Sequence, residues 1–277
     1  MEHARLGLIP LAGDAADARL AAFVAAVARE VDLKLDIHKA ADYRALVAGL
    51  EQRLVDFAWL PPLSAARAVR SGSIAPLAVN VRNGATSYMT GLIAKKSGKI
   101  ASLADLKGVR VGWVDRESAS GYVVIRASLR ALGVSLVDAF SEELFLRSHA
   151  EVARGIHEGR VDVGATCFNF AGDTAHLART GYVGVGGVPL TDVTLLSYTG
   201  PIPADIFATR SGVAPRARER LEAAFFNDTC TVHATAKALA HADGFSRPTP
   251  RHMEMLDTLF QTIVATPRSV PPPGLQR

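Results

Sequence analysis

The segment VRVGWVDRESASGY, residues 109–122, combines the signals of a strand, a turn and the start of a helix. Val109–Val114 is mostly apolar, as in a buried strand, and the spacing of apolar residues predicts a helix over Ser120–Leu132. The turn Glu117–Tyr122 places two serines and a glycine at the start of that helix. Unpaired backbone N–H groups and a partial positive charge at a helix N-terminus favour an oxyanion. The segment therefore predicts either an anion-binding turn or an ordinary N-cap made by one of the serines.

Strands and helices alternate on both sides of this segment. The predicted strands are Leu6–Ile9, Leu33–Ile37, Val55–Leu60, Ala75–Val81, Tyr88–Lys95, Val161–Ala165 and Val193–Tyr198. The predicted helices include Ala15–Val31, Tyr43–Arg53, Leu63–Arg70, Ser148–Glu158, Pro215–Asn227, Ala234–Ala242 and His252–Ala265. Repeated alternation of this kind predicts an α/β protein with mostly parallel sheets.

Two short segments, Arg82–Ser87 and Leu190–Thr194, are the best candidates for crossings between lobes. They divide the chain into a discontinuous first lobe, residues 1–86 and 194–266, and an inserted second lobe, residues 87–193. Residues 267–277 contain four prolines and are expected to form a loose tail.

The composition excludes several classes of protein. Of the 277 residues, 49% are hydrophobic and 21% are charged, which excludes disorder for most of the chain. The net charge of +4 suits a small anionic ligand, but no clustered basic run indicates nucleic-acid binding. No uncharged stretch reaches the ~20 residues of a membrane span. Cys167 and Cys230 make neither a metal site nor a disulfide framework, and the sequence leaves open whether they pair.

The start of the chain bears on its compartment. A strand is expected within a few residues of Met1, and no basic and apolar leader precedes it. We therefore expect a cytoplasmic protein as the sequence stands, or a periplasmic one whose start is a mature or trimmed form.

Four further residues lie where a ligand could contact them. His149 begins a predicted helix, and Asp205 follows a rigid loop with two prolines and a glycine. Tyr43 and Tyr88 lie near strand–helix junctions. Each also has an ordinary explanation, as a cap-region residue, a turn carboxylate or a packed ring.

Ser120, His149 and Asp205 are the residue types of a nucleophilic triad, but only geometry identifies such a triad. The sequence contains neither a nucleotide-binding glycine motif nor a nucleophile elbow.

Taken in order, these segments resemble the phosphate/phosphite/phosphonate-binding proteins of ABC transporters. The motifs span most of the chain: DYRALVAGLE at 42–51, VDFAWLPPLS at 55–64, SYMTGLIA at 87–94, SLADLKG at 102–108, SASGY at 118–122, FLRSH at 145–149, GRVDVGA at 159–165 and the loop Ser197–Asp205. The resemblance implies a type 2 periplasmic-binding-protein fold: two lobes, each a mixed and mostly parallel sheet flanked by helices, with a ligand cleft between them. It implies a binding protein rather than an enzyme, with no cofactor and no metal.

The same resemblance implies which residues contact the ligand: Tyr43, Tyr88, Ser118, Ser120, Gly121, His149 and Asp205. Further candidates are Ser64, Ala119, which stands where the family usually has threonine, and Asp173, as the acidic residue for a ligand's ammonium group. The implied ligand is a small phosphorus oxyanion or organophosphonate, and the implied partner is a transporter permease. The alternative is a cytoplasmic enzyme or ligand sensor on the same fold, similar to proteins of the menaquinone and thiamine pathways.

Overall fold

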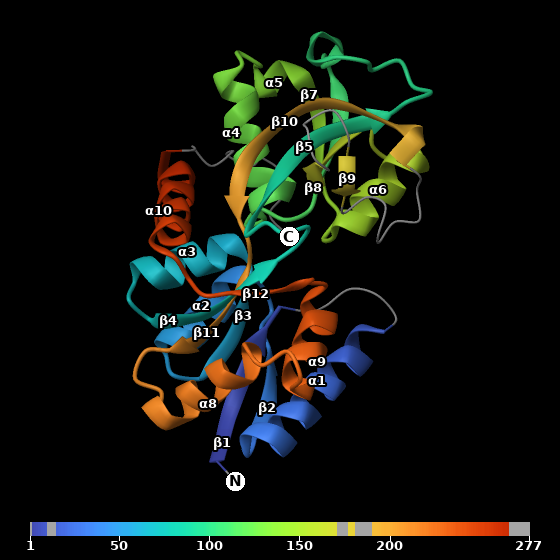
Figure 1. The fold of residues 1–277 in the computed structure, drawn as a ribbon. Coiled ribbons are helices and arrows are strands. Elements are labelled where there is room, and N and C mark those ends of the chain that lie inside the picture. Colours follow the sequence, from blue (N-terminus) through green and yellow to red (C-terminus); the bar gives the residue numbers. More distant parts are fainter. Residues whose placement is uncertain (1, 10–14, 171–176, 181–189, 266–277) are drawn as a thin grey trace.

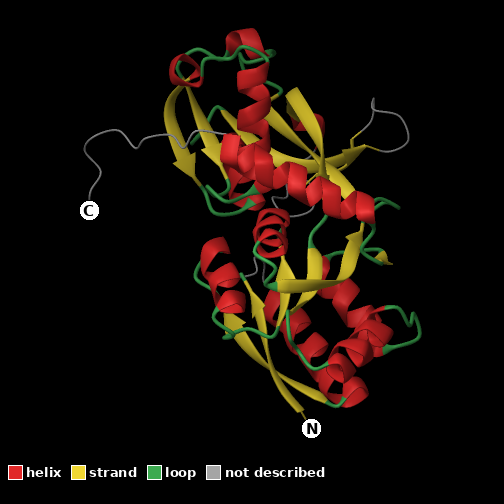
Figure 2. Cartoon of the chain, turned by 90° about the vertical axis from the view of Figure 1, so that its left-hand side faces the viewer, coloured by secondary structure: helices red, strands yellow, loops and turns green. Residues whose placement is uncertain are grey.

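The structure is a computed structural model that describes residues 2–9, 15–170, 177–180 and 190–265. These residues form two lobes, each built on its own β-sheet with helices packed against it (Figure 1). Turning the molecule by 90° shows the same two lobes, one above the other (Figure 2). The predicted α/β class is therefore confirmed, whereas the predicted tail at residues 267–277 lies outside the described residues.

The first lobe contains a sheet with the strand order β12–β4–β11–β3–β1–β2. In chain order its strands are β1 (Glu2–Leu8), β2 (Leu33–Lys39), β3 (Phe57–Leu60), β4 (Ile74–Val81), β11 (Ile206–Arg210) and β12 (Gly244–Ser246). β1 pairs in parallel with β2 and β3, whereas β11 runs antiparallel to both of its neighbours. β11 comes late in the chain but lies inside the sheet, so two distant parts of the sequence build this lobe.

Helices cover both faces of the first sheet. α1 (Ala16–Val31), α8 (Pro215–Phe225) and α9 (Thr231–Ala240) share one core, whereas α2 (Tyr43–Glu51), α3 (Pro62–Arg70) and α10 (Pro250–Ala265) share the other. Successive residues of β11 serve the two faces, with Phe207 in the first core and Ile206 in the second. The first core is aromatic: the ring centroids of Phe23, Phe57, Phe207 and Phe225 lie between 4.8 and 6.3 Å apart. These buried rings make the sheet a firm base for the loops at its edge.

The second lobe contains a sheet with the strand order β10–β5–β8–β6–β7, and β9 pairs with β8. The strands are β5 (Ser87–Lys95), β6 (Val109–Trp113), β7 (Phe140–Phe145), β8 (Val163–Phe170), β9 (Leu177–Thr180) and β10 (Val193–Pro203). The helical segments are η1 (Leu103–Asp105), η2 (Ala119–Val123), α4 (Val124–Ala131), α5 (Leu136–Ala139), α6 (His149–His157) and η3 (Leu190–Asp192). η2 and α4 cover one face around the buried Trp113, and α6 covers the other through Val152 and Ile156.

Two features of the predicted fold need correction. Within the described residues, parallel pairing is confined to β1 with β2 and β3 and to β6 with β7 and β8, so the sheets are mixed but not mostly parallel. The second crossing does not lie at Leu190–Thr194, because β10 pairs with β5 from Val193 to Pro203. The chain returns to the first sheet only between Pro203 and Ile206, so the boundary predicted at residue 194 was too early.

The lobes touch through apolar side chains as well as through the crossings. α10 packs against α3 and also against β10 and α4. Its Leu256 belongs to a core of the first lobe, whereas its Leu259 joins the core around Trp113 in the second. Leu63 of α3 is 1% exposed in that same second-lobe core. α3 and α10 of the first lobe therefore pack directly against the second lobe.

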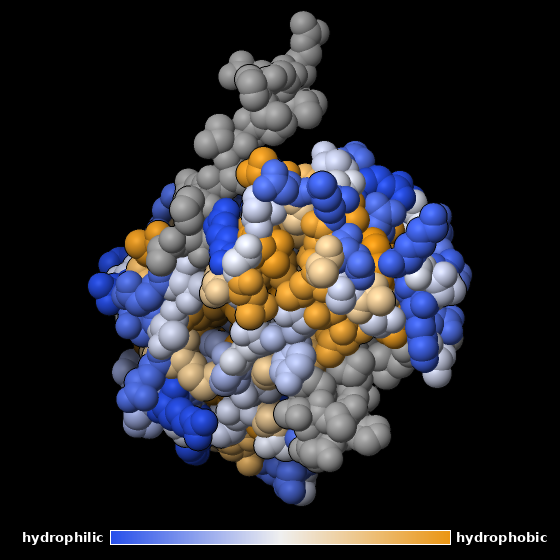
Figure 3. All heavy atoms as spheres, turned by 90° about the horizontal axis from the view of Figure 1, so that it is seen from above, coloured by the Kyte–Doolittle hydropathy of each residue, from blue (hydrophilic) through white to orange (hydrophobic). Residues whose placement is uncertain are grey.

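The surface of the second lobe carries exposed apolar residues. Viewed from above, apolar side chains gather around a hollow (Figure 3). Leu132 and Val137 are exposed in this lobe, and Leu132 lines a groove of about 710 Å³ with Leu103 and Val134. Among the described residues, no helix has the length and apolar character needed to cross a membrane.

Candidate functional site

A short turn leads from β6 into η2, the π-helical start of α4. Ser118 is the N-cap: its Oγ accepts a hydrogen bond from the backbone N of Gly121 at 3.0 Å, and its carbonyl accepts one from Val123 N at 3.0 Å. We call Ser118–Gly121 the anion turn. The predicted serine N-cap is thus present at the start of the helix. The first turn of this helix is π-helical, a form that is frequent at functional sites.

Ser120 of the anion turn faces Tyr88 of β5. The Tyr88 hydroxyl hydrogen-bonds the Ser120 side chain, and Thr90 Oγ1 donates to the Ser120 carbonyl at 2.5 Å. Burial is the main cause that raises the pKa of Tyr88, so its phenol keeps its proton. Ser120 is itself only 2% exposed. Serine and phenol hydroxyls can both donate to an oxyanion, so this pair has the chemistry of an anion contact.

His149 opens α6 beside the anion turn. Ser148 caps this helix by accepting a hydrogen bond from Glu151 N at 3.1 Å, which holds His149 at the first helical position. The His149 ring lies 3.1 Å from Thr166 Oγ1 through Nδ1 and hydrogen-bonds Cys167. Burial opposes the charged imidazole, but the charge and hydrogen bond of Cys167 outweigh it and raise the pKa of His149. A raised pKa favours the imidazolium, which is the form that attracts an anion.

Tyr43 reaches this site from the first lobe. It is the first residue of α2, whose N-cap Asp42 accepts a hydrogen bond from Ala45 N at 2.8 Å. Ser64 is buried behind it and donates to the Tyr43 carbonyl at 3.3 Å. Burial and then the charges of Asp115 and Cys167, both in the second lobe, raise the pKa of Tyr43. The Tyr43 hydroxyl therefore lies close to the second lobe, whereas Ser64 supports its backbone.

Asp205, a predicted ligand contact, has several hydrogen-bond partners within the protein. It lies in the second crossing, and Arg82 of the first crossing donates to both of its carboxylate oxygens, at 2.5 and 3.1 Å. Trp59 Nε1 and Asn80 Nδ2 donate to the same carboxylate. Three of these four donors share Oδ2, whereas Oδ1 accepts only from Arg82. Asp205 is thus a brace that joins the two crossings, and Oδ1, with one donor here, keeps an acceptor position.

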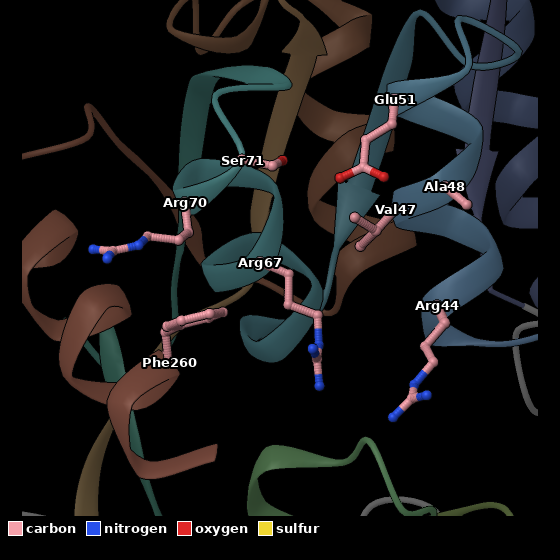
Figure 4. A pocket seen from close by; sticks show the side chains of 8 residues that line it. All are labelled: Arg44, Val47, Ala48, Glu51, Arg67, Arg70, Ser71 and Phe260. Carbon is pink, nitrogen blue, oxygen red and sulfur yellow. The ribbon is translucent and has the colours of Figure 1, made fainter. Parts of the chain in front are cut away.

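Glu117, directly before the anion turn, joins the two lobes. Arg44 of α2 and Arg67 of α3 each contact one of its carboxylate oxygens, at 2.7 and 2.8 Å. Figure 4 shows both arginines extending in the same direction from the rim of a pocket of about 360 Å³ between α2, α3 and α10. The sequence placed Glu117 in the turn but gave no signal for its partners.

The remaining candidates divide into described and undescribed residues. Ala119 is 4% exposed and packs into the core of the second lobe, so this position offers no side-chain donor. Asp173 lies outside the described residues. Within the described part of the chain, no group of three or more His, Cys, Asp and Glu residues could hold a metal ion.

Cys167 is the main residue that sequence reasoning missed. It is half-buried, not fully buried, and it lies within electrostatic range of Tyr43, Tyr88, Arg82 and His149. Its position on β8, beside the start of α6, explains why these groups surround it, and only the sheet topology reveals it. The two cysteines do not form a disulfide with each other: Cys230 lies in the first lobe, where its Sγ donates to Glu30 at 2.6 Å.

Comparison with known proteins adds a family to this geometry. Residues 7–253 match the family described as "ABC transporter, phosphonate, periplasmic substrate-binding protein". The phosphate-import protein PhnD of Mycolicibacterium smegmatis is 25% identical over 210 residues, covering 72% of this chain. The match covers 63% of that relative, so the chain spans less than two thirds of its length.

Two solved structures share the fold. PhnD1 of Prochlorococcus marinus, in complex with methylphosphonate, has a TM-score of 0.75 at 17% identity and covers 95% of this chain and 98% of its own. A binding protein component of an ABC phosphonate transporter from Pseudomonas aeruginosa has a TM-score of 0.73 at 22% identity, covering 97% of this chain and 90% of its own. At these identities the two structures establish the fold of the chain.

Proposed function

The chain belongs to the family of periplasmic substrate-binding proteins of phosphonate ABC transporters, as the sequence resemblance predicted, and on this premise we propose that it captures a small phosphorus oxyanion or organophosphonate for ABC-type uptake. The observation that carries this proposal is the convergence of the anion turn, Tyr88 and His149 in the second lobe with Tyr43 of the first. A transporter permease is the corresponding partner.

Each lobe contributes a different part of the proposed site. The second lobe holds the oxyanion through the hydroxyls of Ser118, Ser120 and Tyr88, the backbone of η2 around Gly121 and the ring of His149. Helix N-termini and hydroxyl donors suit an anion, and a protonated imidazole adds a positive charge. The first lobe adds the hydroxyl of Tyr43.

Closure of the lobes follows from this division. A ligand that contacts both lobes only when they are closed shifts the protein toward the closed form. The two crossings, joined by the Arg82–Asp205 brace, are the natural hinge for this motion. We expect the ligand to leave chemically unchanged, because every proposed contact is a hydrogen-bond donor that holds an oxyanion rather than attacks it.

The experiment is thermal unfolding against methylphosphonate, phosphate, phosphite, 2-aminoethylphosphonate, sulfate and carboxylates. A ligand at 100 times its Kd adds about 2.7 kcal/mol, a shift of several degrees at this size. We expect a shift with a phosphorus oxyanion and its loss in the double variant Ser120→Ala with His149→Ala.

The matched control is Ser128→Ala with His157→Ala, on α4 and on the last turn of α6. It should keep the full shift. A protein that no phosphorus oxyanion stabilises would overturn the proposal and favour an enzyme or sensor on this fold.

A further inference from the structure

We propose that Glu117, Arg44 and Arg67 form an interlobe clamp that sets how long the ligand remains bound. The clamp is built on one carboxylate in the second lobe and two guanidinium groups from separate helices of the first. Arg44 contacts Glu117 Oε1 through Nε at 2.8 Å and through its terminal nitrogen at 2.7 Å. Arg67 contacts Oε2 at 2.8 Å.

The burial of these groups gives the clamp more strength than a surface ion pair has. The Glu117 side chain is 14% exposed, that of Arg67 is 25% exposed and that of Arg44 is 54% exposed. Exposed pairs contribute little, whereas charge-assisted hydrogen bonds screened from water contribute more. The contact between Arg67 and Glu117 is therefore expected to dominate.

The clamp acts directly on the proposed ligand site. Glu117 directly precedes Ser118, and the turn from Asp115 to Ser118 is tight. Asp115 accepts hydrogen bonds from Glu117 N at 2.7 Å and from Ser118 N at 3.0 Å. The arginines of the first lobe therefore grip the same turn that would hold the oxyanion. Because Glu117 and the arginines belong to different lobes, separation of the lobes must break both ion pairs.

A kinetic consequence follows, which rests on the proposed function. Ligand escape requires opening, and opening requires that the clamp break before the ligand leaves. Loss of the clamp should therefore raise the dissociation rate more than it lowers the association rate. Coupling of this kind typically changes affinity about 5- to 150-fold.

The test compares Glu117→Gln and Arg67→Gln with the wild-type chain, using methylphosphonate and inorganic phosphate as probes. Stopped-flow fluorescence should give a dissociation rate raised about tenfold or more in both variants, with the association rate changed much less. Small-angle scattering of the ligand-free chain should show a larger radius of gyration for Glu117→Gln, because the closed form loses its clamp. The thermal midpoint of the ligand-free chain should move little.

The controls are Arg70→Gln and Glu142→Gln. Arg70 lies on the same helix as Arg67 but pairs with Asp257 of α10, and Glu142 is exposed on β7. Both should keep wild-type rates and dimensions. Dissociation rates that rise equally in the controls, or that stay within twofold of wild type in Glu117→Gln, would overturn the clamp.

Failure of the clamp and failure of the proposed function remain distinct. If neither probe binds the wild-type chain, the proposed function fails. The scattering comparison of ligand-free Glu117→Gln with wild type then decides the clamp by itself: unchanged dimensions reject it, and expansion supports it.

Discussion

Gly121 occupies a position in the anion turn where no side chain fits. A Cβ there would overlap the side chain of Val114 and approach Ser118 Oγ to 2.8 Å. Its backbone φ is not in the left-handed region, so the requirement is one of space alone. The glycine therefore allows the backbone of the turn to lie directly against the end of β6.

Gly121→Ala is expected to displace the anion turn and to abolish the thermal shift that a phosphorus oxyanion produces. Overpacking of a buried position costs about 1–3 kcal/mol, so the unliganded protein should also lose several degrees of Tm. Gly244→Ala is the control, because a Cβ at Gly244 meets nothing within 4 Å. Full ligand binding by Gly121→Ala would show that the turn does not contact the ligand.

Asp205→Asn tests the brace against the ligand contact that the sequence predicted. Burial alone would raise the pKa of Asp205, but Arg82, Trp59 and Asn80 outweigh it and hold the pKa below its usual value. The pKa of an Asp carboxyl in the unfolded chain is about 3.9. Because the pKa is lower in the folded protein, the ionised carboxylate stabilises the fold at pH values above about 3.9, and this stabilisation is lost as the pH falls toward the folded pKa. Breaking such a buried pair costs about 3–5 kcal/mol.

Urea unfolding of the ligand-free protein should therefore show that Asp205→Asn lowers the free energy of unfolding strongly at pH 7. The difference from wild type should be smaller at pH 3–4. Asp17→Asn, which breaks the exposed pair with Lys39, should change the free energy of unfolding by less than about 1 kcal/mol. An Asp205→Asn protein of wild-type stability that fails to bind ligand would contradict the brace and favour the predicted ligand contact.

Single residues were predictable here where a local motif carried them. The SASGY motif and the helix start at His149 predicted positions that the structure brings together with Tyr43 and Tyr88. The partners of Asp205 and Glu117 were not predictable, because they are 123 and 73 residues away in the chain. A sequence pattern reports local geometry, whereas these contacts depend on how the two lobes close.

At the scale of elements, α2 depends on its first turn. Asp42 is its N-cap, and the helix then presents Tyr43 and Arg44, which face the site and the clamp. The motif DYRALVAGLE predicted both the helix and its cap, because an Asp before an apolar-periodic stretch satisfies the free N–H groups of a helix start.

Asp42→Ala should lower the free energy of unfolding by about 0.5–2 kcal/mol, because Ala45 N loses its acceptor. Asp42→Asn retains a good cap and should cost much less. Thermal unfolding measures both, and equal midpoints for the alanine and asparagine variants would contradict the cap. Ligand affinity should fall with the alanine variant, because fraying of the first turn releases Tyr43.

Elements were missed where the pattern was short. β7 and β11 were not predicted. β11 has only five residues, with the sequence IFATR, and lies between two loops. Its strand character comes from pairing with β3 and β4, which are distant in the sequence. The boundary at residue 194 failed for the same reason, since only pairing with β5 assigns β10 to the second sheet.

At the scale of the whole molecule, Leu63 couples the two lobes. It belongs to a helix of the first lobe but packs into the core of the second, together with Leu259 of α10. Buried apolar contact of this kind favours unfolding of the two lobes as one unit, because unfolding of either lobe exposes apolar surface of the other.

Leu63→Ala is expected to cost about 2–5 kcal/mol and to broaden or split the calorimetric transition, as the lobes begin to unfold separately. Leu20→Ala, which lies within the first-lobe core, should cost a similar amount and keep a single transition. A single, equally sharp transition in both variants would show that Leu63 does not couple the lobes.

The late position of β11 in the chain has a consequence for synthesis on the ribosome. β3 and β4 are made early, but the strand that joins them is not made until residues 206–210. At about 5–20 residues per second, their facing edges wait on the order of ten seconds, while the complete second sheet emerges. Unpaired edges of this kind invite aggregation. Holding chaperones should therefore bind the nascent first lobe, and substitutions in β11 should reduce the yield of folded protein before they alter its affinity.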